Sequence, residues 1–487
     1  MAEQLWRYGA EKLHEMVLSR EVSCREVVES HLDRIREVEP LLNALITICY
    51  REAVAQADDQ DKRLAKGEPV GPLAGVPISI KDIISTKGVR TTCGSRMLAE
   101  YVPPYDSTAV RKIKEADGII IGKGNVDEFA MGSSTETSHF GPCLNPWDHS
   151  AVPGGSSGGS SASLVAGECA LALAEDTGGS IRQPAAFCGC VGLKPTYGRV
   201  SRYGNIAYAS SFDQIGPMAR STFETARLFE IIAGRDPFDS TSADKPVEKW
   251  TEACGRDVKG LRVAILKEYV SEDLPPEIKA GINKTVDILQ KAGVEISTVS
   301  VPTASYGVPI YYVITMSEAS SNLARYDSIL YGHKTDANEL ISLFTRCRAE
   351  GFGKVVRERI LIGTYALSAG FFDAWYLKAT KARRLVSNEF AQAFRSCDAI
   401  LAPVAPCKAF KVGEKTDDPL AMYLTDVYST IANVVGIPGL AFPVDFHEGL
   451  PVSVQLMAQP FNETVLFQLG SMIEQEVDIP RLWDSAE

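Results

Sequence analysis

Histidine is scarce in this sequence, and its cysteines lack the spacing of a metal site. There are six histidines among 487 residues, which leaves few candidates for a histidine base. The eleven cysteines include no CxxC pair and no Cys/His cluster with zinc spacing, and Cys188-x-Cys190 is more typical of packing. We therefore expect no metal site in this chain, and reduced, mostly buried thiols as in a cytosolic protein.

Positive charge and long apolar runs are also missing. The net charge is −12, which argues against a basic surface for nucleic acid over the whole chain, although a local patch or a partner subunit could hold RNA. No run approaches the roughly 20 apolar residues of a membrane helix. Residues 1–7 lack the apolar core of a signal peptide. We expect a soluble cytoplasmic protein that does not contact a membrane.

Two glycine-serine turns are the most informative feature that is present. The first covers Gly154–Ser160, and the second covers Asp176–Arg182 with the wording Asp-Thr-Gly-Gly-Ser-Ile-Arg. Glycine serves where the backbone adopts positive φ or approaches another group closely. A flexible linker has a similar composition, but the apolar segment 162–174 between the turns suits a buried helix and strand. We therefore interpret both as tight turns that present serine hydroxyls.

The rest of the chain alternates short apolar strands with amphipathic helices. A capping box at Ser23–Glu26 opens the first of these helices. This alternation predicts an α/β fold, with a single large mixed, mostly parallel, twisted sheet covered by helices on both faces. Strands are expected at residues 76–80, 119–121, 262–266, 294–301, 399–402, 440–444 and 452–457, and further helices at 51–66, 106–116, 222–233, 276–292, 373–394 and 463–476.

Three kinds of chemistry use such turns. A phosphate cradle is the first, but its nearest candidate, residues 118–124, is one residue short and lacks the hydroxyl. A GxSxG nucleophile elbow fits the first turn, yet only His333 and His447 follow it, both in plain sequence. The third is a serine activated by a neutral lysine. Lys81 suits that role because it ends an apolar strand, where burial without a carboxylate partner would favour the neutral amine.

The order of Lys81 and the two turns resembles the amidase signature family, and the likeness covers nearly the whole chain. The resemblance implies that Ser180 is the nucleophile that becomes acylated, that Ser156 relays the proton after a cis Gly155–Ser156 peptide, and that Lys81 is the terminal base. It also implies an oxyanion hole built from the backbone of Thr177, Gly178, Gly179 and Ser180. Asp176 and Arg182 are expected to hold the loop and not to touch substrate.

Four further stretches resemble one branch of that family, the A subunits of glutamyl-tRNA(Gln)/aspartyl-tRNA(Asn) amidotransferases. They are residues 128–134, 317–323, 359–367 and 422–426. In this branch an arginine and an aspartate hold the substrate glutamine. The matching positions are Arg359 for the α-carboxylate and Asp426 for the α-ammonium, a chemically sound pair for a zwitterion. The other expected pocket residues are Tyr311, for which Tyr312 is an alternative, Met131 and Gly132.

The resemblance implies one amidase domain over residues 1–487. N-terminal helices would occupy about 1–66, a core about 71–235, and the remainder would complete the sheet and the glutamine pocket. The expected activity is hydrolysis of glutamine, whose ammonia amidates Glu-tRNA(Gln) in a reaction that uses ATP and Mg²⁺. Asp-tRNA(Asn) stays open as a second acceptor. No cofactor is expected to bind tightly to this chain. The B subunit would bind ATP and the mischarged tRNA, and a C subunit would complete a heterotrimer.

Two positions depart from the family pattern. Glu175 precedes the second turn where a small residue is expected, and residues 428–435 differ after Asp426. Two other functions stay open. A stand-alone amidase would act on a small or acyl amide, and a nucleotide-binding module would use the glycine turns for phosphate.

Overall fold

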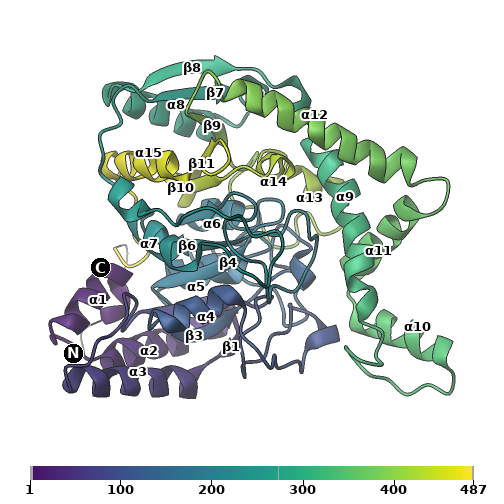
Figure 1. Ribbon diagram of the computed structural model, residues 1–487, viewed down its shortest axis with the longest axis horizontal. Helices are drawn as coiled ribbons and strands as arrows, with labels where there is room; N and C mark the ends of the chain where they lie inside the picture. Colours follow the sequence, from purple (N-terminus) through teal and green to yellow (C-terminus); the bar gives the residue numbers. More distant parts are fainter. Residues whose placement is uncertain (1–3, 273, 485–487) are drawn as a thin grey trace.

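The strands of the chain join into one sheet that runs through the molecule (Figure 1). The computed structural model describes residues 4–272 and 274–484. Along the sheet, the order is β1 (Leu45–Ile48), β3 (Ile119–Gly124), β2 (Pro77–Lys81), β4 (Leu171–Glu175), β6 (Ile215–Ala219), β5 (Val191–Lys194), β10 (Gly439–His447), β11 (Leu450–Ala458), β9 (Ala399–Pro403), β7 (Arg262–Leu266) and β8 (Glu295–Val299). The expected single mixed sheet is confirmed.

The expectation of a mostly parallel sheet was wrong. Parallel neighbours are β2 with β3 and β4, and β7 with β8 and β9. The other six of the ten neighbouring pairs are antiparallel. The β10–β11 hairpin and the strands β5 and β6 account for most of these. Their short apolar runs do not differ in pattern from parallel strands, so the sequence does not reveal their direction.

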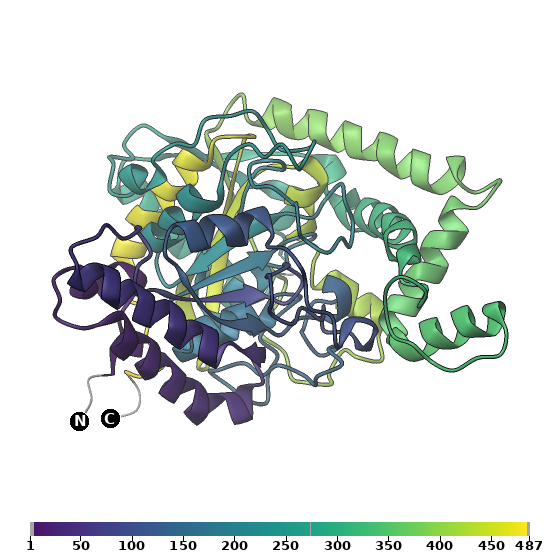
Figure 2. The same ribbon diagram turned by 60° about the horizontal axis from the view of Figure 1, so that its bottom comes forward.

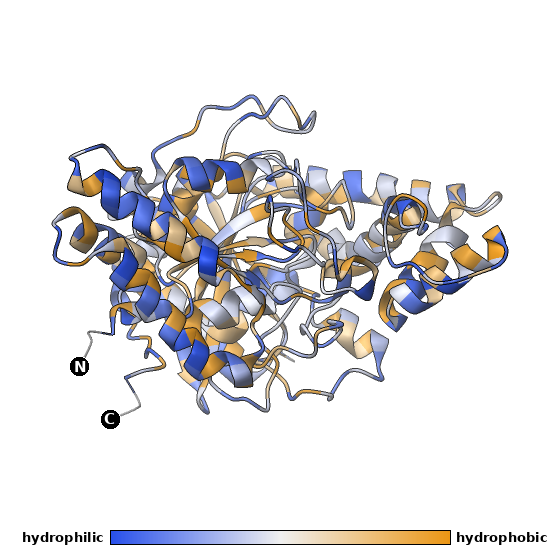
Figure 3. Ribbon diagram, turned by 90° about the horizontal axis from the view of Figure 1, so that it is seen from below, coloured by the Kyte–Doolittle hydropathy of each residue, from blue (hydrophilic) through white to orange (hydrophobic). Residues whose placement is uncertain are grey.

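Helices surround the sheet. They are α1 (Ala10–Leu18), α2 (Cys24–Leu42), α3 (Tyr50–Ala65), α4 (Thr108–Glu115), α5 (Gly158–Ala166), α6 (Arg182–Cys188), α7 (Thr222–Ile232), α8 (Pro276–Lys291), α9 (Gly307–Asn322), α10 (Leu340–Gly351), α11 (Lys354–Leu367), α12 (Lys378–Ala393), α13 (Pro419–Leu424), α14 (Thr430–Val435) and α15 (Glu463–Glu476). Figure 3 shows hydrophobic strands at the centre and outer helices in which hydrophilic and hydrophobic residues are interleaved. This is the pattern of a core covered by amphipathic helices.

Local signals explain several of these elements. Ser23 and Glu26 form the expected capping box at the start of α2, which satisfies two amide donors of the first turn. Ser107 caps α4 through the Val110 amide. By contrast, α9, α10 and α11 were not expected from the sequence. They form an arm at one side of the molecule (Figures 1 and 2).

The helix α5 between the two glycine turns is entirely buried. It packs against β2, β3, β4 and β6. Small residues permit this close approach: a Cβ added at Gly159 would lie 2.2 Å from the Asn125 amide nitrogen. The first turn is therefore part of the core, which excludes the flexible-linker interpretation.

No helix among the described residues combines the length and the apolar character needed to cross a membrane.

The contact between α9 and α11 depends on Gly363, and we predict that Gly363→Ala destabilises the protein. An added Cβ would lie 1.9 Å from the Met316 carbonyl oxygen on α9, so the two helices must separate. Such overpacking costs about 1–3 kcal/mol, and the thermal unfolding temperature should decrease. Leu361→Ala is the control on the same helix, because that side chain is 69% exposed and its loss should change stability by less than about 0.5 kcal/mol. Equal stability of both variants would contradict this packing.

Candidate active site

Lys81 ends a strand of which every residue is buried, and its amine lies between the two glycine turns. Lys81 Nζ is 2.8 Å from Ser156 Oγ in the first turn. It is 2.9 Å from the Glu175 carbonyl oxygen and 3.0 Å from Glu175 Oε2, just before the second turn. The parallel pairing of β2 with β4 brings these groups together. The predicted contact between Lys81 and Ser156 is therefore present.

The first turn is held by groups outside it. The Gly155–Ser156 peptide is cis, as the family resemblance implies. The Gly155 amide donates to Gln183 Oε1 at 2.8 Å. Because a Cβ added at Gly155 would lie 2.2 Å from an Asp127 carboxylate oxygen, only glycine fits at this position.

The second turn connects β4 to α6 and is fixed by Asp176. Its carboxylate accepts from the Gly179 amide at 2.7 Å and pairs with Arg182 at 3.1 Å. Burial alone would raise the pKa of Asp176, but Arg182 lowers it to about 2. Asp176 and Arg182 thus hold the loop, as expected from the sequence.

The nucleophile candidate Ser180 lies in this turn and is 6% exposed. Within the described part of the chain, the amides of Thr177, Gly178 and Ser180 make no hydrogen bond. They are free to receive an oxyanion. The Gly179 amide differs because it donates to Asp176.

Arg359 and Asp426, the two candidates for binding the glutamine and together called the clamp, come from different elements and contact the same tyrosine. Arg359 on α11 lies 5.4 Å from the centre of the Tyr312 ring, and Tyr312 donates to Asp426 Oδ2 at 3.0 Å. Among the ion pairs of the described residues, none joins Arg359 to Asp426. Each charge is thus available to a ligand.

Further contacts leave both clamp groups poorly paired. Arg359 Nη1 donates to Tyr208 Oη at 2.9 Å, whereas its buried Nε has no partner in the described structure. Asp426 accepts from Ser133 Oγ at 2.7 Å. Burial raises the pKa of Asp426 to about 7, although these hydrogen bonds and Arg359 favour the anion. A ligand ammonium would favour the anion further.

The other three pocket candidates have distinct surroundings. Tyr311 lies against the second turn, since a Cβ added at Gly178 would be 2.4 Å from its ring. A Cβ at Gly132 would lie 2.3 Å from the Asp127 carboxyl group, and Met131 beside it is fully buried. Gly132 and Met131 therefore shape the loop that carries Ser133.

A family model described as Amidase matches residues 26–467. The chain belongs to the amidase family. It is 49% identical over 476 residues to the glutamyl-tRNA(Gln) amidotransferase A subunit of Carboxydothermus hydrogenoformans, with 98% of each chain covered. It is 50% identical over 473 residues to the protein of the same name from Heliobacterium modesticaldum, with 97% of each covered. The resemblance noted in the sequence is thereby confirmed.

The crystal structure of the glutamyl-tRNA(Gln) amidotransferase A subunit from Thermotoga maritima has the same fold. Its TM-score to this amidase is 0.81 at 38% identity, and the match covers 97% of this chain and 95% of that one. The expected amidase signature fold is confirmed.

This amidase differs from the sequence-based expectation at its lysine. The expectation placed Lys81 away from any carboxylate, whereas Glu175 Oε2 is 3.0 Å from its amine and both side chains are fully buried. The cause is the register of β4, which directs the last residue of that strand to the amine. The sequence did contain a sign of this carboxyl group, because Glu175 stands where the family pattern has a small residue.

Several residues that support the amidase site were not identified from the sequence. The Asp127 carboxylate accepts from the Thr135 amide at 2.8 Å and from Thr137 Oγ1 at 2.8 Å, which folds the loop that carries Ser133. Ser429 Oγ donates to the Gly178 carbonyl oxygen at 2.8 Å. Tyr208, which accepts from Arg359, and Ser133, which donates to Asp426, also belong to this group. Tyr312, which donates to Asp426, is the alternative to Tyr311 that the sequence analysis named.

The alternative motifs have structural roles. Lys123, in the segment that resembles a phosphate cradle, is buried and donates to the Ile84 carbonyl oxygen and Thr91 Oγ1, both at 2.7 Å. His333 contacts Glu350 at 3.2 Å, and His447 lies half exposed at the end of β10. Within the described residues there is no group of three His, Cys, Asp or Glu side chains that could hold a metal ion.

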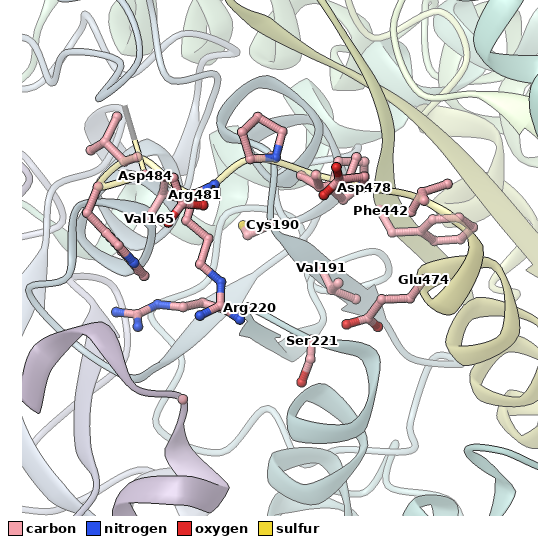
Figure 4. A pocket seen from close by; sticks show the side chains of 18 of the residues that line it. Val165, Cys190, Val191, Arg220, Ser221, Phe442, Glu474, Asp478, Arg481 and Asp484 are labelled. Atoms are coloured by element: carbon pink, nitrogen blue, oxygen red, sulfur yellow. Dashed lines mark hydrogen bonds between the residues drawn. The ribbon is translucent and has the colours of Figure 1, made fainter. Parts of the chain in front are cut away.

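A separate cavity of about 490 Å³ lies under the segment that follows α15 (Figure 4). Its lining includes Arg220, Glu474 and Arg481. None of the relay or clamp residues lines it, so this cavity is distinct from the candidate active site.

Proposed function

We propose that this chain is the glutaminase component of a tRNA-dependent amidotransferase. The observation that carries the proposal is the pair Arg359 and Asp426, two buried groups of opposite charge that form no ion pair within the described residues and both contact Tyr312. A free amino acid carries one carboxylate and one ammonium at fixed separation, and this pair matches both. The similarity over the whole chain to the A subunits of glutamyl-tRNA(Gln) amidotransferases supports the same conclusion.

In the proposed reaction, Ser180 attacks the side-chain amide carbon of glutamine. Its proton passes to Ser156, and the Ser156 proton passes to Lys81, which is already within hydrogen-bond distance. The amides of Thr177, Gly178 and Ser180 stabilise the oxyanion. Ammonia leaves, and water then hydrolyses the glutamyl ester on Ser180.

The ammonia passes to a partner that activates Glu-tRNA(Gln), and in some cells Asp-tRNA(Asn), with ATP and Mg²⁺. We assign ATP and tRNA binding to a B subunit and a bracing role to a small C subunit, which together form a heterotrimer with this chain. The net charge of −12 supports this division, since RNA binding needs a basic surface. The complex would act in the cytoplasm.

Ser180→Ala should abolish glutamine hydrolysis and leave ammonia-dependent amidation of tRNA intact. Loss of the nucleophile typically costs roughly four orders of magnitude or more in kcat, whereas free ammonia bypasses the step. The measurement is tRNA amidation by the full complex with glutamine or with ammonium chloride. Ser163→Ala is the control, because its hydroxyl is buried and its partners, the Ser160 carbonyl oxygen, Ser79 and Cys169, are not residues of the relay. Loss of both activities in Ser180→Ala would contradict the division of labour.

Arg359→Ala should raise the KM for glutamine far more than it affects a simple amide without a carboxylate. A charge-assisted hydrogen bond is worth about 1.5–3 kcal/mol, which corresponds to roughly a tenfold to hundredfold change. The ratio of kcat/KM for the two amides measures this preference. Arg357→Ala, an exposed arginine of the same helix, should leave the ratio unchanged. An equal loss on both amides would favour a folding role and a stand-alone amidase.

Glutamine selectivity should fall as the pH falls through about 7. The carboxyl of Asp426, whose pKa burial raises to about 7, must be ionised to bind the ammonium. Protonation below this pKa removes the attraction, and the ratio of kcat/KM for glutamine to that for a simple amide should decrease by up to about tenfold per pH unit. Asp426→Asn should give a low ratio that does not change with pH. A ratio in the wild type that is constant from about pH 5.5 to 8 would contradict this assignment.

A further inference from the structure

Glu175 poses a chemical problem for the proposed lysine base. A carboxylate 3.0 Å from Lys81 Nζ, buried with it, favours the charged ammonium. An ammonium has no lone pair and cannot take a proton from Ser156. A site that hydrolyses an amide near neutral pH therefore needs a way to keep the charge of Glu175 away from the amine.

The hydrogen bonds of Thr177 indicate how this is achieved. Its single hydroxyl contacts Glu175 Oε1 and also Asp213 Oδ1, the latter at 2.9 Å. A hydroxyl donates one hydrogen and accepts others. It can donate to one of these oxygens only, so the other carboxyl group must itself carry a proton. Glu175 and Asp213 thus hold one proton between them.

The surroundings of Asp213 place that proton on Glu175. Asp213 Oδ2 accepts from the Tyr208 amide at 3.0 Å, and Oδ1 accepts from the Ala209 amide at 2.9 Å. Burial and the neighbouring Glu175 raise the pKa of Asp213, as expected for two carboxyls that share a proton. Two amide donors with the Thr177 hydroxyl nevertheless favour the anion at Asp213. Among the described residues, the only hydrogen-bond partners of the Glu175 carboxyl group are Thr177 and Lys81.

This arrangement also suits a neutral lysine. A neutral amine has two hydrogens and one lone pair, and Lys81 Nζ has three neighbours. The two hydrogens are donated to the carbonyl oxygen and to Oε2 of Glu175. The lone pair then faces Ser156 Oγ, the atom whose proton it must accept.

We propose that Glu175 is a positioning residue for the Lys81 base and acts as a neutral carboxylic acid, its Oε1 proton donated to Thr177, which donates to Asp213. The proposal rests on the relay given under the proposed function. It deepens that function by explaining how a site with a carboxylic residue beside its lysine keeps the amine able to accept a proton.

The proton balance of the acylation step is simple in this arrangement. The Ser180 oxygen forms a bond to the amide carbon, the Ser180 proton moves to Ser156, and the Ser156 proton moves to Lys81. Lys81 becomes an ammonium while Glu175 keeps its proton, and Asp213 is the permanent counter-charge. When the carbon–nitrogen bond breaks, the proton returns from Lys81 through Ser156 to the departing ammonia.

Other ionisable groups lie on the elements that neighbour Lys81 and Glu175. Asp82, after β2, pairs with Lys123 on β3 at 3.5 Å, and Asp176, after β4, pairs with Arg182 on α6. Burial raises the pKa of the Cys93 thiol, which stays neutral. Burial also moves the pKa of three further groups, Lys194 on β5, Asp426 and Glu128, to about 7. A pH profile must therefore be compared between variants and not read from the wild type alone.

The test compares Glu175→Gln with Glu175→Leu in the full chain with its partner subunits. Glutamine at position 175 reproduces the neutral acid, because its carbonyl accepts from Lys81 and its NH₂ donates to Thr177. Leucine fills a similar volume with no polar atom. We expect Glu175→Leu to lower kcat by roughly tenfold or more with KM little changed. Glu175→Gln should recover most of kcat and keep the acid limb of the kcat profile at the wild-type pH.

Two kinetic outcomes would overturn the proposal. If Glu175 is ionised beside Lys81, Glu175→Gln removes a full negative charge, and the acid limb should move to lower pH by about one unit or more. If Glu175→Leu is as active as Glu175→Gln, Glu175 has no positioning role. Glu474→Gln is the control, since Glu474 is a partly buried carboxyl group on α15 that lines the separate cavity.

A measurement without turnover keeps the proposal testable if Glu175→Leu does not fold. Infrared spectra of protein with isotope-labelled glutamate should contain the carbonyl band of a protonated carboxylic acid that Glu175→Gln removes. Absence of that difference at neutral pH would overturn the proposal. If the band is present and the wild-type complex does not hydrolyse glutamine, the proposed function fails and the protonation of Glu175 stands.

Discussion

The amine of Lys81, buried without access to water, is the constraint on which the site depends. A buried amine must find hydrogen-bond partners inside the protein. The pairing of β2 with β4 and the turn before α5 supply those partners. They are the Ser156 hydroxyl, the Glu175 carbonyl oxygen and Glu175 Oε2. The two glycine turns are held at this distance because each is bonded to the rest of the core. A shift of either turn would leave the amine unsatisfied, so the relay geometry and the stability of the core are coupled.

The parts of the fold and the site that could be predicted are those encoded by local sequence patterns. Lys81 at the end of an apolar strand, the glycine turns on either side of a buried helix, and the Ser23 capping box are local patterns, and the structure contains all of them. The substrate side depends on contacts between distant residues. Ser133 donates to Asp426, 293 residues away, and Tyr208 accepts from Arg359, 151 residues away. No spacing in the sequence encodes such contacts, and only the family resemblance pointed to Arg359 and Asp426.

The predictions of strand direction and of the surroundings of Lys81 were wrong for a related reason. A run of buried apolar residues such as β5 or β6 has the same pattern in parallel and antiparallel sheets, so the sequence could not show that antiparallel neighbours predominate. Glu175 was visible as a departure from the family pattern. Its meaning required the register of β4 against β6 and the position of Asp213 before β6, which bring Thr177 between the two carboxyl groups.

The division of the site between two parts of the chain has a functional consequence. The proposed relay comes from residues 81–182, whereas the proposed clamp comes from α9, α11 and the segment after α13. The two parts meet where Tyr311 packs on Gly178 and where Ser429 bonds to the same residue. Substitutions in the clamp could therefore change which ligand binds without altering the groups around Lys81. Because both contacts act on a residue of the proposed oxyanion hole, binding in the clamp can still affect the geometry of the nucleophile turn, which would couple recognition of the amino acid to the reactivity of Ser180.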